Sequence, residues 1–378
     1  MKRSLCLFIA LVWCASSAAG QKPRSHRAPA KPAAASKTTQ PNFKAIWEPV
    51  NYKEDLNLTG VFFANDQTGW VTGEHGTILH TTDGGDTWTP QLGGDPQSTE
   101  PAIHDLRFTD GTHGWADQGS GGDNKLLRTT DGENWEQVGK LGGNYGYWSD
   151  YFFPSGNVGF QIRQQPHDIA RTLDAGKTWT EVAPPCAVKM EVEGLTRTVG
   201  CTLQSLHFPS PRVGYAIGTG SKALFVLRTE DGGQNWNVSV SPDLASNQST
   251  YFRQEVFFTS ENTGFVIMND RKILATTDGG KTWQGRVGTT GGKIRFADPE
   301  VGWSVEDLTL TYTTNAGKSW FSRKFGFPAT ITAFSLPSRS RGYVVGRHGM
   351  VYRYRIVPFE YITKGMIDAP MMPGDPAK

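Results

Sequence analysis

One short segment recurs along this chain of 378 residues and limits its possible folds more than any other feature. The segment begins with Thr, continues through Asp or Asn and Gly, and ends with Trp. Five copies have eight residues: 81–88, 172–179, 229–236, 276–283 and 313–320. A sixth, 129–135, is one residue shorter. Such a recurrence predicts a repeat architecture, in which each repeat forms one supersecondary unit.

A second landmark, a Gly followed by an aromatic residue, recurs at intervals of 38 to 55 residues. The seven copies are Gly69-Trp70, Gly114-Trp115, Gly159-Phe160, Gly214-Tyr215, Gly264-Phe265, Gly302-Trp303 and Gly342-Tyr343. Within a repeat, short apolar runs alternate with Gly-rich turns, which indicates four short strands. Four strands in a repeat of this length are typical of a propeller blade. We therefore predict an all-β chain with a single seven-bladed β-propeller.

There are seven landmarks but only six Trp-ending segments. The last blade therefore lacks the Trp-ending segment and the strand that follows it. Residues 45–50 resemble the strand that follows Trp88 or Trp179. We expect this N-terminal strand to supply the outer strand of the last blade. Closing the ring in this way removes a free sheet edge.

The Trp-ending segments have the Ser/Thr-x-Asp-x-Gly-x-Thr-Trp form of the Asp-box, or BNR, repeat. In a hairpin, Asp accepts hydrogen bonds from turn amides, Gly adopts a positive φ, and Trp packs between blades. Asn315 keeps part of this bonding, and the short second box predicts a tighter turn. We interpret all six boxes as structural, through Asp83, Asp131, Asp174, Asp231, Asp278, Asn315, Trp88, Trp135, Trp179, Trp236, Trp283 and Trp320.

The N-terminus has the pattern of a secretory signal peptide over residues 1–20. Two basic residues precede an apolar run of ten, and small residues follow. Residues 21–42, rich in Pro, Ala and Lys, predict a flexible tether. The propeller is expected over 43–363 and a disordered tail over 364–378. The protein is then exported, to a periplasm or to the medium, and does not span a membrane.

Two of the four cysteines, Cys6 and Cys14, lie in the predicted signal peptide. A lipoprotein site at Cys14 is the weaker alternative, because Trp13 stands where a small residue is needed. Cys186 and Cys201 remain, and in an oxidising compartment we expect them to form a disulfide that closes a surface loop.

Charge and motifs exclude several classes of function. The net charge is +2, which gives no general reason to expect nucleic-acid binding. Residues 1–42 hold seven basic residues and no acidic one, so the remainder has a net charge of −5. HExxH, CxxC, GxSxG and EF-hand motifs do not occur in the sequence. We therefore expect no cofactor, no metal site and no catalytic residue, and interpret His75 and His348, in equivalent turns, as turn residues.

One face of the predicted propeller is the candidate binding face. It carries the turns between second and third strands and the connections between blades, opposite the Asp-box turns. Its candidate residues are His75, Lys125, Arg163, His167, Lys222, Arg271, Asp307, Arg347 and His348, with Tyr145, Tyr147, Trp148, Tyr251, Phe252, Arg286 and Arg323 in connections. Aromatic residues and Arg favour protein binding, although solvated loop charge explains any one of them. Three arginines come just before a box: Arg128, Arg171 and Arg228. We expect the aliphatic part of each side chain to pack along a strand edge and its guanidinium group to lie in water.

The boxes, the Gly-aromatic landmarks and the N-terminal strand together resemble the photosystem II stability/assembly factor family of exported BNR propellers, over residues 43–357. The resemblance implies a protein without a catalytic site, which binds a membrane-protein partner during assembly through an Arg-rich surface. On the candidate binding face it implies contributions from Arg163, Arg271, Arg286, Arg323 and Arg347, beside Tyr147 and Trp148. We expect a monomeric scaffold for a membrane or envelope complex.

The alternative is a glycan-binding protein or a glycoside hydrolase, because some sialidases and endoglucanases carry Asp-boxes. The Arg-Ile-Pro motif of sialidases is absent near the first blade. Hydrolysis needs two carboxylates, and the sequence does not sort Asp117, Asp123, Asp150, Asp168 and Asp307 into pairs. Acidic side chains converging at the central channel favour a hydrolase, whereas an exposed basic and aromatic rim favours a scaffold.

Overall fold

The computed structural model describes residues 43–50, 52–119, 123–142, 150–163, 168–183, 186–192, 194–220, 223–241, 254–268, 273–286, 293–369 and 371. The predicted signal peptide and tether lie outside these residues. Every regular element in the described ranges is a β-strand, and seven sheets form the blades of a β-propeller. The predicted fold class and blade number are therefore confirmed.

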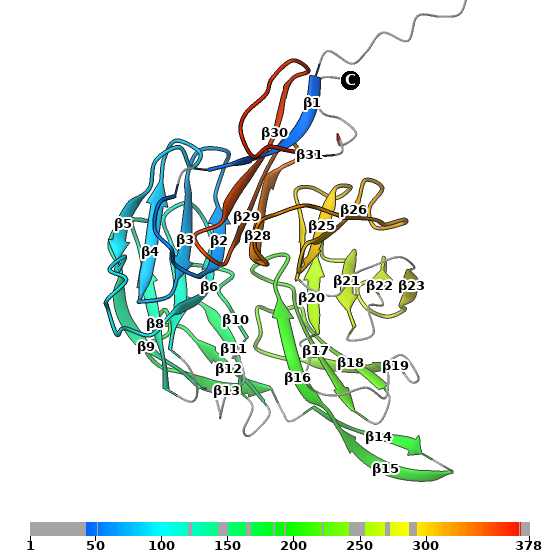
Figure 1. The fold of residues 1–378 in the computed structure, drawn as a ribbon. Helices are drawn as coiled ribbons and strands as arrows, with labels where there is room; N and C mark the ends of the chain where they lie inside the picture. Colours follow the sequence, from blue (N-terminus) through cyan, green and yellow to red (C-terminus); the bar gives the residue numbers. More distant parts are fainter. Residues whose placement is uncertain are drawn as a thin grey trace, which may run out of the picture. The chain divides into compact units, whose positions relative to one another are not determined.

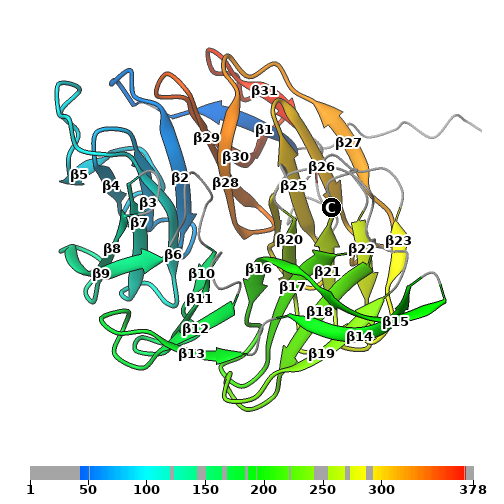
Figure 2. The ribbon, with the colours of Figure 1, turned by 90° about the horizontal axis from the view of Figure 1, so that it is seen from below.

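Six blades are antiparallel sheets of four strands in chain order. Blade 1 is β2 (Leu58–Phe63), β3 (Gly69–Gly73), β4 (Thr77–Thr81) and β5 (Thr89–Leu92), and blade 2 is β6 (Ile103–Phe108), β7 (Gly114–Gln118), β8 (Asp123–Thr129) and β9 (Glu136–Gly142). Blade 3 is β10 (Tyr151–Phe152), β11 (Gly159–Arg163), β12 (Asp168–Thr172) and β13 (Thr180–Ala183), and blade 4 is β16 (Thr202–His207), β17 (Gly214–Gly220), β18 (Ala223–Thr229) and β19 (Asn237–Ser241). Blade 5 is β20 (Glu255–Phe258), β21 (Gly264–Ile267), β22 (Ile273–Thr276) and β23 (Gln284–Arg286), and blade 6 is β24 (Lys293–Phe296), β25 (Gly302–Glu306), β26 (Thr309–Thr313) and β27 (Phe321–Lys324). Figure 2 shows first strands near the centre and fourth strands at the periphery.

Blade 7 joins the two ends of the propeller. Its strands are β28 (Ile331–Ser338), β29 (Arg341–Gly346), β30 (Val351–Pro358), β1 (Phe43–Pro49) and β31 (Ile367–Ala369), in that order. The N-terminal strand β1 pairs antiparallel with β30, which confirms the predicted closure. Closure by β1 places the first and last parts of the propeller in one sheet (Figure 1).

Two details of blade 7 differ from the prediction. The outermost strand is β31 rather than β1, and it lies inside residues 364–378, for which we predicted a disordered tail. The free edge of β1 explains the difference, because Ile367 pairs opposite Trp47 and packs on the same apolar cluster. Residues 370 and 372–378 lie outside the described part of the chain.

Trp47 occupies the position that the box Trp has in the other blades. In the strand pairing, Trp47 lies opposite Tyr354, and Tyr354 lies opposite the landmark residue Gly342. Blade 1 has the equivalent arrangement, in which Thr81 of the box lies opposite the landmark residue Gly69. The Trp47 ring lies 5.4 Å from the ring of Trp303, the landmark aromatic of blade 6. The N-terminal strand thus supplies the seventh inter-blade Trp.

A ring of Phe side chains explains why the landmark is Gly followed by an aromatic residue. In six blades a Phe six residues before the landmark Gly lies across that Gly, and a Cβ there would overlap the Phe ring. The same Phe stacks on the landmark aromatic of the preceding blade, with centroid separations of 3.4 to 4.8 Å. These residues are Phe63, Phe108, Phe153, Phe208, Phe258 and Phe296. The sequence contained their constant spacing, but our interpretation missed it.

Replacing Gly214 by Ala tests this packing. The new Cβ would overlap the buried Phe208 ring, so we expect the free energy of unfolding to fall by about 1–3 kcal/mol, measured by urea denaturation. Gly285→Ala is the control, because nothing lies within 4 Å of the added carbon. Equal stability of the two variants would contradict the close packing.

A hairpin outside the blades, β14 (Ala187–Val192) with β15 (Leu195–Gly200), joins blade 3 to blade 4. Cys186 and Cys201 form the predicted disulfide at its base. The hairpin extends away from the sheets of the propeller at the lower right of Figure 1. Among the described residues, none belongs to a helix with the length and apolarity needed to cross a bilayer.

Candidate functional site

The Asp-boxes form closed hydrogen-bond networks in their turns. In the box of blade 3, Asp174 accepts bonds from the Thr178 amide at 2.9 Å and hydroxyl at 2.6 Å, and from the Thr172 hydroxyl at 2.7 Å. The Thr178 side chain and amide lower the pKa of Asp174 from 3.8 to about 2. The Gly176 amide donates to the Thr172 hydroxyl. All carboxylate bonds of the box thus lie within its own turn.

The two atypical boxes keep the same bonds with local adjustments. In the short box of blade 2, the Asn134 amide donates to the Asp131 carboxylate, and these residues are three positions apart in the sequence. In the box of blade 3 the corresponding residues, Thr178 and Asp174, are four positions apart. In blade 6, Asn315 Oδ1 accepts the Ser319 amide at 2.9 Å, and its Nδ2 donates to the Ser319 hydroxyl. The turn in blade 2 is therefore tighter, as the sequence predicts.

The arginines that precede three boxes are half-buried and lie beside aromatic rings. The guanidinium carbons of Arg128, Arg171 and Arg228 lie 5.7 to 5.9 Å from the centroids of the landmark rings on the paired strands. Arg128 also donates to the Gly156 carbonyl of the next blade at 3.2 Å. The side chains pack along the strands as expected, and the aromatic ring on the facing strand also attracts each partly exposed guanidinium group.

The central channel is a cavity of about 270 Å³ between the first strands of the blades. Its lining mixes charged, polar and apolar residues, among them Gly60, Phe62, Asp105, Arg107, Phe152, Ser205, His207, Glu255, Phe257, Lys293, Arg295, Ala333 and Ser335. Side chains two residues apart on a first strand point to the same side of the sheet. The channel therefore collects residues that lie far apart in the sequence.

Two carboxylates, Asp105 and Glu255, line this channel, and a third, the buried Asp150, bonds to Arg107 of the lining. Lys293 Nζ lies 2.8 Å from Asp105 Oδ1, joining blade 6 to blade 2. Arg295 bonds to Glu255 at 2.7 Å, which connects blades 6 and 5.

The third carboxylate belongs to Asp150, and each of its oxygens bonds to a neighbouring blade. Its Oδ1 accepts from Arg107 at 2.8 Å, and its Oδ2 accepts the Leu206 amide at 2.7 Å. Asp150 thus connects blade 3 with blades 2 and 4. These three carboxylates act as links between blades.

His207 also lies at the channel, between Phe152 and Phe257. Its Nδ1 accepts the Phe258 amide at 3.3 Å. Burial, with repulsion from Arg295 and Arg107, lowers its pKa from 6.5 to about 3. His207 is therefore neutral at pH 7 and poorly matched to proton transfer at that pH.

Two sets of turns lie on opposite faces of each blade, as the sequence predicts. In blade 1, His75 Nδ1 contacts the Ser98 carbonyl at 2.5 Å, between the β3–β4 turn and the connection to blade 2. The Gly84 amide of the box turn donates to Gln67 in the β2–β3 loop. His75 and His348 both adopt a positive φ, 57° and 56°. Among the described residues, no group of three or more His, Cys, Asp or Glu is placed to hold a metal ion.

The predicted partner-binding arginines have different surroundings. Arg163 Nε donates to Asp168 Oδ1 at 2.6 Å, its Nη2 bonds to Asp168 Oδ2, and Glu181 lies 3.6 Å away. Asp168 is fully buried, so the Arg163 charge is largely balanced within blade 3. Arg323, on β27, is exposed and lies over the Phe325 ring. Arg347 is exposed in the β29–β30 turn.

A second cavity adjoins Arg347 at the junction of blades 6 and 7. It has a volume of about 260 Å³. Its apolar wall includes Val50, Ala329 and Met350, with Arg347 and His348 at its border. The segment 325–330, which follows β27, connects this cavity to Arg323 and Lys324. We call Arg323, Lys324, Arg347 and this cavity the blade 6–7 rim.

The remaining predicted contact residues are not placed. Tyr147, Trp148 and Arg271 lie outside the described residues. Arg286 ends β23 opposite Ile273, and its side chain also lies outside them. Among the predicted arginines whose side chains the structure describes, Arg323 and Arg347 lie in neighbouring blades, 6 and 7.

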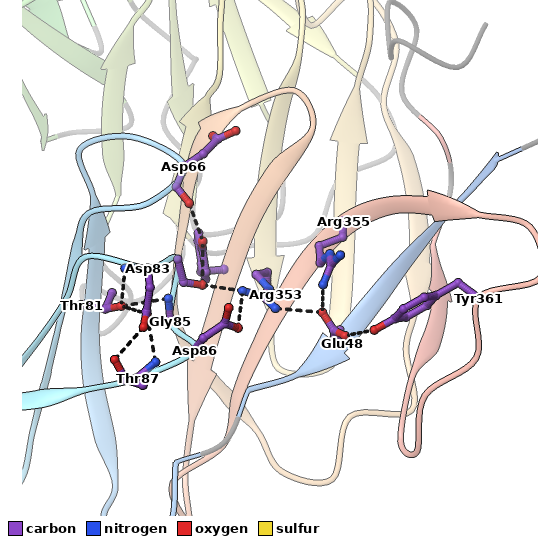
Figure 3. Close-up of polar contacts among 12 residues, drawn as sticks. Glu48, Asp66, Thr81, Asp83, Gly85, Asp86, Thr87, Arg353, Arg355 and Tyr361 are labelled. Atoms are coloured by element: carbon purple, nitrogen blue, oxygen red, sulfur yellow. Dashed lines mark hydrogen bonds and ion pairs between the residues drawn. The ribbon is translucent and has the colours of Figure 1, made fainter.

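A buried polar network on the box side holds β1 in place (Figure 3). Arg353 donates to the Gly84 carbonyl at 2.8 Å and to Glu48 at 3.0 Å, and it contacts Asp86 at 2.9 Å. Glu48 also accepts from Arg355 and Tyr361. This network joins the closing strand, β30 and the first box, and sequence patterns gave no signal for it.

Comparisons with known proteins agree with this architecture. A protein-family model described as Photosynthesis system II assembly factor YCF48 matches residues 185–286, from the β14–β15 hairpin to the end of blade 5. Photosystem II stability/assembly factor HCF136, chloroplastic, from Oryza sativa subsp. japonica is 25% identical over 362 residues. That match covers 83% of this chain and 83% of the relative.

Solved structures show the same fold. "YCF48 bound to D1 peptide" has a TM-score of 0.56 and 21% identity, and covers 86% of this chain and 98% of that one. YCF48 from Cyanidioschyzon merolae has a TM-score of 0.55 and 19% identity, with 82% and 98% covered. A GH74 xyloglucanase from Xanthomonas campestris has a TM-score of 0.53 and 17% identity, with 82% and 53% covered. In its repeats and fold, this chain is a BNR β-propeller that is similar to the photosystem II assembly factors.

Proposed function

We propose that the protein is a non-catalytic scaffold that binds a protein partner through the blade 6–7 rim. The partner is a component of a membrane or envelope complex, which this monomeric propeller meets after export. The observation that carries the proposal is an apolar cavity lined by exposed Arg347 and by Pro328 and Ala329, which follow exposed Arg323 in the chain. Such a surface suits a peptide segment with an apolar side chain and a nearby carboxylate.

A peptide-bound relative supports this choice of ligand. One of the similar solved structures is that of YCF48 bound to a D1 peptide. A propeller of this type is therefore able to bind a peptide.

Glycoside hydrolysis has less support. Asp105 and Glu255 do line the channel, and Asp150 bonds to Arg107 of its lining, so acidic side chains gather there as expected of a hydrolase. However, each is bonded to Lys293, Arg107 or Arg295. A hydrolase needs one carboxyl group to donate a proton and another to attack or to activate water. The channel carboxylates are instead engaged in holding the blades together.

The test is crosslinked co-purification of the tagged full chain from its own cell envelope. After detergent extraction, bound proteins are identified by mass spectrometry. We expect one near-stoichiometric membrane protein, and about tenfold less of it with Arg323→Glu and Arg347→Glu, because charge reversal opposes an acidic partner.

Lys281→Glu with Lys318→Glu is the matched control, since these exposed cations lie in box turns on the opposite face. Recovery is expected to be unchanged in this variant. If no specific protein is recovered and the purified chain binds or cleaves an envelope polysaccharide, the scaffold proposal is wrong.

A further inference from the structure

The closing strand β1 differs from the fourth strands of other blades in how its residues are buried. Four consecutive residues of β1, 45–48, are buried. In β5, β9, β19 and β27, whose residues are all described, Leu141 is the single buried residue. Those strands end their blades facing water, whereas β1 carries Ala45 and Trp47 at an edge that is covered by another strand.

The cover is β31, a strand of three residues that the chain itself supplies (Figure 2). Ala369 lies opposite Ala45, and Ile367 lies opposite Trp47. Ile367, Ala369 and Met371 all pack on the hydrophobic cluster that contains Ala45 and Trp47. Apolar residues at alternate positions of an extended segment point to the same side. β31 thus occupies the edge of β1 in the way that a bound peptide adds a strand to a sheet.

β31 covers this edge over a short length. The pairing of β1 with β30 spans seven residues of β1, 43–49, whereas its pairing with β31 spans three, 45–47. Ile367 and Ala369 are half-buried, and Pro370, the next residue in the sequence, has no amide hydrogen to donate. A short edge strand with half-exposed side chains opens at a lower free energy than the core of a fold. A longer strand from another protein is able to pair with more of β1 and to replace β31.

The connection from β30 to β31 allows β31 to leave without disturbing blade 7. Tyr361 is held in place because its hydroxyl bonds to the Glu48 carboxylate. A turn follows, in which the Met366 amide donates to the Thr363 carbonyl at 3.3 Å and Gly365 has a φ of 77°. Glycine changes its backbone conformation more freely than any other residue. Release of β31 therefore needs a change only after Tyr361, and the Glu48 network stays intact.

We propose that the edge of β1 is a second peptide-binding site, which β31 occupies until a partner replaces it. The ligand is an extended segment of another protein that has apolar side chains at alternate positions and adds antiparallel to β1. Main-chain hydrogen bonds provide the affinity, and the cluster beneath Ile367 and Ala369 selects apolar side chains. Exchange with β31 of a second copy is less favoured, because it adds no residue pair. The site does not depend on the blade 6–7 rim.

Fluorescence anisotropy with a labelled peptide tests this site on the full chain. The peptide has the sequence of residues 364–371 with Pro370→Thr, and a scrambled peptide of the same composition is its control. Ile367→Ser weakens the cover, so we expect this variant to bind the peptide about tenfold more tightly than the natural chain. Ile362→Ser, at a side chain 79% exposed, is the matched control and should bind as the natural chain does. The charge-reversed rim variant should also bind normally.

A disulfide lock should produce the opposite change. Ala45→Cys with Ala369→Cys places two thiols at directly opposite positions of β1 and β31, a spacing that a disulfide is able to bridge. The oxidised lock should bind the peptide about tenfold more weakly than the reduced lock. The natural chain, measured with and without the same reductant, accounts for loss of the Cys186–Cys201 disulfide. Because one variant is compared in two states, a folding defect does not imitate the result.

Failure of the peptide to bind the Ile367→Ser variant overturns the proposal, as does equal binding of the ordered and scrambled peptides. Equal binding by the oxidised and reduced lock also overturns it, because β31 and the peptide would then not share a site. If no peptide binds and the natural chain forms a concentration-dependent dimer that the oxidised lock abolishes, the occupant is a second copy and the proposed partner is wrong.

Discussion

Replacing Trp47 by Ala is expected to lower the free energy of unfolding by about 3–5 kcal/mol. Trp47 is 1% exposed, and its ring contacts Trp303, Phe327 and Tyr354 at centroid distances of 5.4 to 5.6 Å. Its loss leaves a cavity where the N-terminal strand joins blade 6 to blade 7. Urea denaturation followed by far-ultraviolet circular dichroism measures the change.

Trp88→Ala is the matched control for ring closure. Trp88 has the equivalent position in blade 1 but is only half-buried, and its blade is closed by consecutive strands. We expect a smaller loss of stability and no release of β1. Limited proteolysis distinguishes the two variants, because only Trp47→Ala should expose residues 43–49 to cleavage. Equal loss and equal cleavage would contradict a closing role for Trp47.

Replacing Arg353 by Met is expected to lower the free energy of unfolding by about 3 kcal/mol at pH 7. The Arg353 side chain is 10% exposed and bonds to Gly84, Glu48 and Asp86. Without it, the Gly84 carbonyl and the Glu48 carboxylate lose a buried cationic donor. Arg355→Met is the control and should cost less, since Arg355 is 32% exposed and bonds only to Glu48 among these groups.

The same variant changes the response to acid. Burial alone would raise the pKa of Glu48, but hydrogen bonds from Tyr361, Arg353 and Arg355 outweigh it and lower the pKa below 4.5. The ionised carboxylate therefore stabilises the fold above pH 4.5, and this contribution is lost as pH falls through the lowered value. In Arg353→Met the loss should begin at a higher pH. An unchanged acid midpoint would contradict the role of Arg353 in this network.

The candidate site was predicted in part. Arg323 and Arg347 are exposed, as expected of contact residues, whereas Arg163 is paired with the buried Asp168 on the next strand. The repeat pattern of the sequence predicts on which face of the propeller an arginine lies. It does not predict whether a nearby carboxylate neutralises the charge of that arginine. The links of the channel were also not predictable, because Lys293 and Asp105 are separated by 188 residues.

The sequence by itself determined the repeat, the number of blades and the closing strand. The interactions of box turns, landmark glycines and alternating apolar residues are local in the sequence. Each repeat therefore contains the residues that specify its own blade. Only the tertiary structure decided which charged side chains form ion pairs between blades, and that β31 covers the edge of β1. Those outcomes depend on residues such as Glu48 and Arg353, 305 positions apart, which meet only when the ring closes.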